Sequence, residues 1–359
     1  PTKKQNVAKA SVVVKPTKKL SAAKASVVAK PTKKQNAAKA SAVAKPIKKL
    51  NAAKASVVAK PTKKQNAAKA SAVAINKPFP LKLSGAGLGL RRDFADLLLD
   101  DLNDPIDFFE VAPENWMKMG GRFEQLFAQI AERHTMTTHG LSLSIGSPDP
   151  LDIQFVKEIK AFLDRYKIEL YSEHLSFCSA NGHMYDLMPI PFTEEAASYV
   201  AERVKLVQDI IERPLVLENV SYYTPLNSEI SEIEFINSVL AESGALLLLD
   251  VNNVYVNSIN HKYDARAFID AMPTDKIVYG HIAGHYNEAE DLIVDTHGAD
   301  VIAEVWQLLA YAYQQHGIFP TLLERDFNIP SLPDLCQEVN QIKQTQVAAE
   351  QFEQINVII

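Results

Sequence analysis

Short apolar runs alternate with amphipathic stretches along the chain from about Lys82 onward. Several runs are continuously hydrophobic, which is typical of strands buried on both faces. The runs cover 83–90, 106–112, 135–145, 168–177, 214–221, 245–253, 276–284 and 320–326. Between them, the stretches 151–166 and 299–315 place apolar residues on one helical face. Eight strand–helix units in about 270 residues predict a (β/α)8 TIM barrel.

A doubly wound open sheet is the alternative fold for such an alternating chain. That fold would carry a G-x-G-x-x-G turn for phosphate, followed by an acidic residue further along the chain. The glycines here, Gly85, Gly87 and Gly89, have a different spacing and lack that acidic partner. The pattern therefore favours the barrel.

The first 75 residues are a fifteen-residue repeat with 19 lysines and no acidic residue. The units begin at Pro1, Pro16, Pro31, Pro46 and Pro61. A proline in every unit limits any helix to a length that is marginal alone, and unpaired lysines repel one another. We therefore expect a disordered, lysine-rich segment over 1–75, the barrel over 76–348 and a C-terminal tail over 349–359.

The charge is distributed unevenly between these segments. The formal net charge is −5, but the last 284 residues hold 19 basic and all 43 acidic residues, a balance of −24. Clustered lysine attracts phosphate, so 1–75 is expected either to contact nucleic acid or an acidic surface, or to be a solvated extension without a partner. The acidic remainder argues against a barrel that itself binds DNA.

The remaining composition bears on the compartment. No apolar run reaches 18 residues and no apolar core of a secretory signal is present, so we expect no membrane span. Cys178 and Cys336 lie 158 residues apart, which is neither a disulfide framework nor a zinc-knuckle spacing. These features predict a soluble protein of a reducing, cytoplasmic compartment.

Side chains of metal-binding types end almost all of the predicted strands. Because barrel enzymes carry their chemistry at the carboxyl ends of the strands, we expect these side chains to converge. They are His139, Glu173 with His174, Glu218 with Asn219, Asp250 with Asn253, His281, Glu324, and Asp295 with His297 in the loop after the seventh strand. So many carboxylates and imidazoles, with Arg325 as the one arginine nearby, predict more than one bound divalent metal ion.

The sequence around these residues resembles the DUF692 family, also called UPF0276, which contains multinuclear non-heme iron-dependent oxidative enzymes. The resemblance covers about residues 83–326 and excludes the repeats. It rests on EVAPENW (110–116), THGLSLSIG (138–146), YSEHLSF (171–177), LENVSYY (217–223), LDVNNVYVN (249–257), GHIAGH (280–285), DTHG (295–298) and LERD (323–326). The family belongs to the xylose-isomerase-like barrel superfamily.

The resemblance implies a ligand scheme for the metals. One ion would be held by His139, His174 and Glu218. Glu218 would bridge to a second ion, whose other ligands are Asp250, His281 and Glu324. A third and weaker position would use Asn253, Asp295 and His297, because a neutral amide oxygen is a poor ligand.

The resemblance also implies the reaction. Two or three iron ions, with zinc or manganese as other candidates for the site, would use dioxygen as a cosubstrate to oxidise a cysteine of a ribosomally made precursor peptide. A separate peptide-recognition protein would deliver the precursor. Glu114 and Asn219 are expected near the site, with no residue assigned as acid or base.

Two other functions are compatible with the sequence. One is a metal-dependent hydrolase or isomerase of the same barrel type, acting on abasic DNA or a sugar. The other is a non-catalytic binding protein in which the lysine-rich segment does the work. The retained set of ligand side chains favours an enzyme over the binding protein.

Overall fold

The computed structural model describes residues 83–99, 105–224 and 228–358. These residues belong to one compact unit, Ile75–Ile359. The segment 1–75, for which the sequence predicts disorder, lies outside the described residues. In the part of the chain that is described, no helix is long and apolar enough to cross a membrane, and neither cysteine forms a disulfide.

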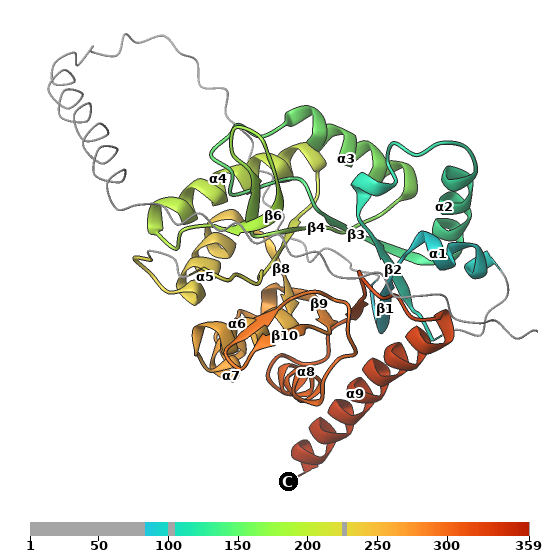
Figure 1. Ribbon diagram of the computed structural model, residues 1–359, viewed down its shortest axis with the longest axis vertical. Helices are drawn as coiled ribbons and strands as arrows, with labels where there is room; N and C mark the ends of the chain where they lie inside the picture. The colour runs from blue at the N-terminus through green and yellow to red at the C-terminus, as the bar shows by residue number, and fades with distance from the viewer. Residues whose placement is uncertain (1–82, 100–104, 225–227, 359) are drawn as a thin grey trace, which may run out of the picture. The chain divides into compact units, whose positions relative to one another are not determined.

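Eight parallel strands close into a barrel in the order β1-β12-β9-β8-β7-β4-β3-β2 (Figure 1). Each observed strand lies within one of the eight predicted runs, so the barrel prediction is confirmed. The strands are β1 (Ala86–Gly89), β2 (Phe108–Val111), β3 (Thr135–Gly140), β4 (Tyr171–His174), β7 (Leu215–Glu218), β8 (Leu246–Asp250), β9 (Ile277–Ala283) and β12 (Thr321–Glu324).

Helices surround the barrel and bury their apolar faces against it. In α3, which the sequence predicted over 151–166, Val156, Ile159 and Leu163 are all buried. The helices are α1 (Arg92–Ala95), α2 (Gly121–Arg133), α3 (Ile153–Tyr166), α4 (Glu194–Ile211), α5 (Glu232–Ser243), α6 (Val251–His261), α7 (Ala265–Asp270), α8 (Ala303–His316) and α9 (Leu332–Ile358), with 3-10 turns at Asp96–Leu99, Pro113–Asn115 and Thr274–Lys276.

The inside of the barrel changes from apolar to polar along the strands. Side chains at alternate positions of a strand share one face. Phe108, Val216, Leu248, Tyr279 and Leu322 form one buried cluster. The residues two positions later are Glu110, Glu218, Asp250, His281 and Glu324. The apolar layer therefore forms a floor, and the ligand-type residues lie above it at the carboxyl ends.

Three features of the fold were not predicted. Two antiparallel hairpins extend the loops after β4 and β9. They are β5 (Ser176–Ser179) with β6 (His183–Pro189), and β10 (Tyr286–Ala289) with β11 (Leu292–Val294). The run 245–253 ends as a strand at Asp250, because the Asp250 side chain accepts the backbone N–H of Asn253 at 2.6 Å and caps α6. Helix α9 continues through 348, the expected end of the barrel, to Ile358.

Candidate metal centre

Three groups of side chains at the carboxyl ends of the strands could each hold a metal ion. In each group, one ligand atom per residue lies within 4.8 Å of the others. The groups are His139, His174 and Glu218; Glu218, Asp250 and His281; and His297, Glu324 and Asp326. Seven of the nine predicted site residues are members. Glu218 belongs to two groups, which is the geometry that a bridging carboxylate requires.

The first group lies between β3, β4 and β7. The Glu218 Oε2 atom is 3.1 Å from His139 Nε2 and 3.4 Å from His174 Nε2, and the two Nε2 atoms are 3.1 Å apart. The Nδ1–H of His174 donates to the carbonyl of Gly140 at 3.0 Å. The Nε2 lone pair of His174 therefore faces Glu218, as a metal ligand would.

The second group forms around His281 at the end of β9. The His281 Nδ1 atom is 3.2 Å from Glu324 Oε2, 3.9 Å from Asp250 Oδ2 and 4.0 Å from Glu218 Oε1. Glu218 thus turns one oxygen to the first group and the other to the second. All four side chains lie two positions after residues of the apolar floor, on the neighbouring strands β7, β8, β9 and β12.

The third group differs from the expected set of Asn253, Asp295 and His297. Asp295 does contact His297, with Oδ1 2.7 Å from Nε2. Asn253 instead donates from Nδ2 to Glu218 Oε1 at 3.1 Å. Its place beside His297 is taken by Asp326, whose Oδ2 lies 3.0 Å from Nδ1. The reason is that Asn253 lies in the first turn of α6, which directs it toward β7.

A buried chain of hydrogen bonds fixes the orientation of two ligand-type histidines. The Nδ1 of His139 lies 2.8 Å from Ser172 Oγ, which lies 2.6 Å from the hydroxyl of Tyr279. Tyr279 donates to Glu110 Oε2 at 2.8 Å, and Glu110 Oε1 lies 3.0 Å from His281 Nε2. These contacts are favourable when His139 carries its hydrogen on Nδ1 and His281 carries its hydrogen on Nε2. His139 Nε2 and His281 Nδ1 then present lone pairs to the groups of ligands.

The three side chains of the first group have strongly shifted pKa values. Burial opposes ionisation of Glu218, but the nearby His174 and His139 lower its pKa to about 2. Burial lowers the pKa of His139, yet Glu218 outweighs it and raises the pKa to about 9. Burial and the neighbouring His139 lower the pKa of His174 to about 4. At neutral pH and without a metal, the group therefore holds an ionised Glu218, a protonated His139 and a neutral His174, so His139 would release a proton when a cation binds.

The donor set fits metal ions better than a purely structural role. Buried polar atoms are normally paired. Seven buried ligand-type atoms at this centre form no hydrogen bond, and the close contacts that most of them make are with other carboxylates and imidazoles of the centre or with Glu110. All seven belong to residues that the sequence singled out. They are Glu218 Oε2, Asp250 Oδ2, Asn253 Oδ1, both ring nitrogens of His281, His297 Nε2 and Glu324 Oε2. Burial and then Glu218 raise the pKa of Asp250 well above its usual range, and a bound cation would reverse that shift.

Glu114, Glu173 and Asn219 support the centre from outside it. Glu114 Oε1 accepts the backbone N–H groups of Leu141 and Ser142, at 2.9 and 3.0 Å. Glu173 Oε1 accepts the N–H of Leu143 at 3.0 Å. These two carboxylates hold the loop that follows His139. Asn219 pairs with both the N–H and the carbonyl of Asp250, each at 2.9 Å.

His285 lies near the centre without joining a group of ligands. Its Nδ1 is 2.8 Å from Asn252 Oδ1, and Asn252 Nδ2 donates to Asp295 Oδ1 at 2.7 Å. His285 therefore positions Asp295 through Asn252.

Two residues of the centre were missed in the sequence. Glu110 lies two positions after the inward-facing Phe108 and had the strand position of a ligand, but it was not among the predicted ligands because it lies within the run 106–112 and not at its end. Asp326 follows β12 by two residues, and its ion pair with Arg91 depends on a contact across the closed barrel.

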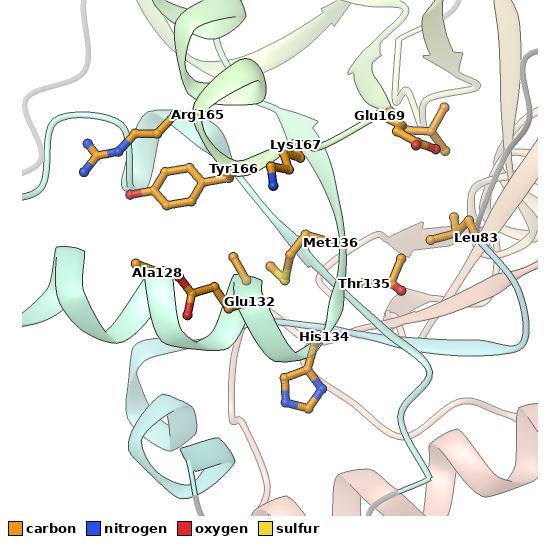
Figure 2. Close-up of a pocket in the computed structure, with 12 residues that line it drawn as sticks. Leu83, Ala128, Glu132, His134, Thr135, Met136, Arg165, Tyr166, Lys167 and Glu169 are labelled. Atoms are coloured by element: carbon orange, nitrogen blue, oxygen red, sulfur yellow. The ribbon is translucent and has the colours of Figure 1, made fainter.

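A separate cavity of about 560 Å³ lies at the opposite, amino-terminal end of the strands. Figure 2 shows it between the ends of α2 and α3, with Glu132 on one side and Tyr166 and Lys167 on the other. This end of a barrel serves stability in enzymes of this fold. The candidate metal centre is therefore the one at the carboxyl ends.

The fold and these groups define a (β/α)8 barrel with a carboxylate–histidine centre of the metal-binding kind. Residues 85–347 match the family model of the RiPP precursor modification enzymes MbnB/TglH/ChrH, where RiPP denotes ribosomally synthesised and post-translationally modified peptides. The chain belongs to this family of modification enzymes.

Curated relatives agree with that assignment, and a solved structure agrees with the fold. A UPF0276 protein of Shewanella sediminis is 63% identical over 262 residues, which are 73% of this chain and 94% of that protein. A UPF0276 protein of Pseudomonas aeruginosa is 51% identical, over 74% and 93% of the two chains. The crystal structure of 3-keto-D-glucoside 4-epimerase from E. coli shares the fold, with a TM-score of 0.50, 12% identity and coverage of 72% and 98%.

Proposed function

We propose that this protein is an oxidase with two or three iron ions that uses dioxygen to modify a cysteine of a ribosomally made precursor peptide. The proposal is carried by one observation, the pair of ligand groups that share Glu218 in a barrel of a peptide-modifying family. Mixed histidine and carboxylate ligands suit iron that must keep positions open for dioxygen.

In this proposal each side chain has a defined task. His139, His174 and Glu218 hold the first ion, and Glu218, Asp250 and His281 hold the second, with Glu324 as a further ligand. A third ion would use His297, Glu324 and Asp326, with Asp295 next to it. Bound iron would supply the redox chemistry that dioxygen requires.

The chain's own residues would prepare that chemistry. The hydrogen bonds from His139 through Ser172 and Tyr279 to Glu110 hold the imidazoles in the metal-binding tautomer. Glu114 and Glu173 hold the backbone of the loop 141–143, which follows His139. The apolar floor below the centre limits water in the barrel, which strengthens charge interactions at the ligands.

A peptide substrate is supported by the loops around the centre. Large aromatic side chains are exposed on several segments that follow the strands: Tyr185 in β6, Tyr223 after β7, Tyr286 in β10 and Phe327 after β12. Their exposed fractions are 99%, 41%, 57% and 65%. These residues all follow barrel strands in the chain, and exposed aromatic side chains are common where a protein binds a peptide or another protein. A separate peptide-recognition protein would also find room there.

Metal analysis tests the proposal. The protein is purified without oxygen after growth in iron-rich medium, and its metals are measured by elemental analysis and Mössbauer spectroscopy. We expect about two or more irons per chain and their loss in Glu218→Ala. Glu242→Ala removes an exposed carboxylate elsewhere and should keep the iron. Stoichiometric zinc or manganese without iron would reject the oxidase and favour a hydrolase or isomerase of this barrel type.

A further inference from the structure

A second cavity, of about 610 Å³, lies beside the start of α5 and the end of α6. It is lined mainly by ring and aliphatic side chains, among them Phe192, Tyr222, Tyr263 and Phe268. The cavity contains none of the ligand-type residues of the metal centre. Tyr222 links it to that centre, because the preceding residue, Ser221, donates to Asp295 Oδ2 at 3.2 Å.

One carboxylate in this cavity, Glu232, lies in the first turn of α5, where a negative charge is favourable, but no positively charged side chain pairs with it in the described part of the chain. Glu232 Oε2 accepts the hydroxyl of Tyr222 at 3.1 Å, and no ion pair to Glu232 occurs among the described residues. Glu232 does not cap α5, because Ser231 and Glu234 form a complete capping box. The other acid in the lining, Asp264, is fully used as the cap of α7.

The carboxylate is held in surroundings that disfavour its charge. Burial is the largest influence and raises the pKa of Glu232 to about 7. A partly buried carboxylate without a cation is unfavourable, so a cation that enters the cavity is stabilised by the charge and stabilises it in return. Lys262 lines the cavity but is exposed and forms no ion pair with Glu232.

The rings of the lining determine which cation fits. Tyr263 and Phe268 are nearly parallel, with centroids 5.6 Å apart and an interplanar angle of 17°. Tyr222 stacks on His261 at 4.0 Å and 16°. The Nε2–H of His261 donates to the backbone carbonyl of Tyr222 at 2.8 Å, which fixes this stack. In each pair one ring, Tyr263 or His261, is only partly buried, and a planar, weakly hydrated guanidinium packs against such a ring better than a strongly hydrated ammonium does.

We propose that this cavity binds the guanidinium group of an arginine side chain in a peptide, with Glu232 as its counter-ion and the aromatic rings as its walls. Nothing in the metal chemistry of the neighbouring centre requires this site, so it stands or falls separately from the oxidase proposal. The 19 lysines and absent arginines of residues 1–75 make that segment a poor occupant.

Calorimetric titration of the full-length protein with n-butylguanidinium tests the site. We expect saturable binding to the wild type, weaker binding of n-butylammonium, and no measurable binding of neutral n-butanol. Glu232→Gln keeps the size of the side chain and an acceptor for Tyr222, and it should weaken n-butylguanidinium binding roughly tenfold or more. Glu229→Gln, which removes an exposed charge nearby but outside the cavity, should leave the affinity unchanged.

A second variant protects the test if Glu232→Gln fails to fold. Lys262→Gln removes an exposed positive charge at the cavity and should strengthen n-butylguanidinium binding about twofold to threefold. Absence of saturable binding, or equal affinity of wild type and Glu232→Gln, would overturn the proposal. Binding of n-butanol as tight as that of n-butylguanidinium, or tighter binding of n-butylammonium, would overturn the assignment to guanidinium.

Discussion

Single residues beneath the ligand layer set how the histidines face the centre. Glu110 Oε2 accepts from the hydroxyl of Tyr279, Glu110 Oε1 lies 3.0 Å from His281 Nε2, and all three side chains are buried. Removing the acceptor frees the His281 ring to rotate or to change tautomer. A carboxylate that supports a ligating histidine in this way contributes substantially to metal affinity.

We predict that Glu110→Ala weakens metal binding about 10-fold to 100-fold, as removal of such a supporting carboxylate does in other metal sites. Competition with a chelator of known affinity measures the change. Tyr279→Phe leaves the Glu110–His281 contact in place and should have a smaller effect. Equal affinities of Glu110→Ala and wild type would mean that His281 is oriented by its other neighbours.

A second residue-scale prediction concerns the pH dependence of stability. The pKa of Glu232 is about 7 in the folded protein, whereas the ordinary value of a glutamate, expected in the unfolded chain, is 4.5. The folded state therefore holds more protons between these values, so the contribution of Glu232 to stability falls as the pH rises through this window. Glu232→Gln lacks the titrating group, so its stability relative to wild type should increase by about 1–3 kcal/mol from about pH 5 to pH 8.

Urea unfolding of both proteins at several pH values measures this difference, since guanidinium chloride would supply the cation proposed for the cavity. Comparing the two proteins cancels the titration of the metal-binding groups. A difference in stability that does not change with pH would show that Glu232 titrates near its ordinary pKa.

Residue types at strand ends were the most informative part of the sequence. The carboxyl ends of parallel strands meet in a closed barrel, so His139, Glu218 and His281 could be expected to converge without knowledge of any distance. Partners that depend on side-chain direction could not be predicted. Asn253 turns to Glu218, and Asp326 faces His297, because the first turn of α6 and the end of β12 direct them there.

At the scale of elements, the strands were predicted well because each is a short buried run with few alternatives. The hairpins β5–β6 and β10–β11 were not predicted, because their strands are short and half-exposed and their pairing contains register shifts. Their existence depends on contacts with loops around the centre rather than on a periodic pattern. The fold therefore follows from local pattern, and the surroundings of the site do not.

One buried arginine attaches helix α9 to the barrel. Arg325, whose side chain is 3% exposed, donates to both oxygens of Glu338 in α9 at 3.1 and 2.6 Å, and to Asp300 at 2.8 Å. Helix α9 also packs on α8 and β1 (Figure 1). Loss of the arginine would leave Glu338 without its partner at this interface.

We therefore predict that Arg325→Ala lowers the free energy of unfolding by about 2–4 kcal/mol, because breaking a buried pair leaves an uncompensated charge. Lys343→Ala removes the half-exposed pair between α9 and Asp107 and should cost less than about 1 kcal/mol. Urea unfolding monitored by circular dichroism measures both. Equal costs for the two variants would mean that apolar packing, not Arg325, attaches α9.

At the scale of the whole molecule, the chain combines two parts of opposite charge. Residues 1–75 carry 19 positive and no negative side chains, whereas the rest has a balance of −24. The family match begins only at residue 85, and 73% of the chain aligns with the Shewanella sediminis relative. We infer that the metal centre works without the repeats, and that any affinity for polyanions belongs to the repeats alone.

The final prediction compares the full chain with a version that begins at residue 76. Fluorescence anisotropy with a labelled DNA duplex should give binding by the full chain that weakens steeply with added salt, because lysines release counterions from phosphate. The shortened protein should not bind, since its net charge repels the duplex. Its iron content per chain and its Tm should equal those of the full chain. Duplex binding by the shortened protein would place a cationic surface on the barrel, and loss of iron would mean that the repeats contribute to the centre.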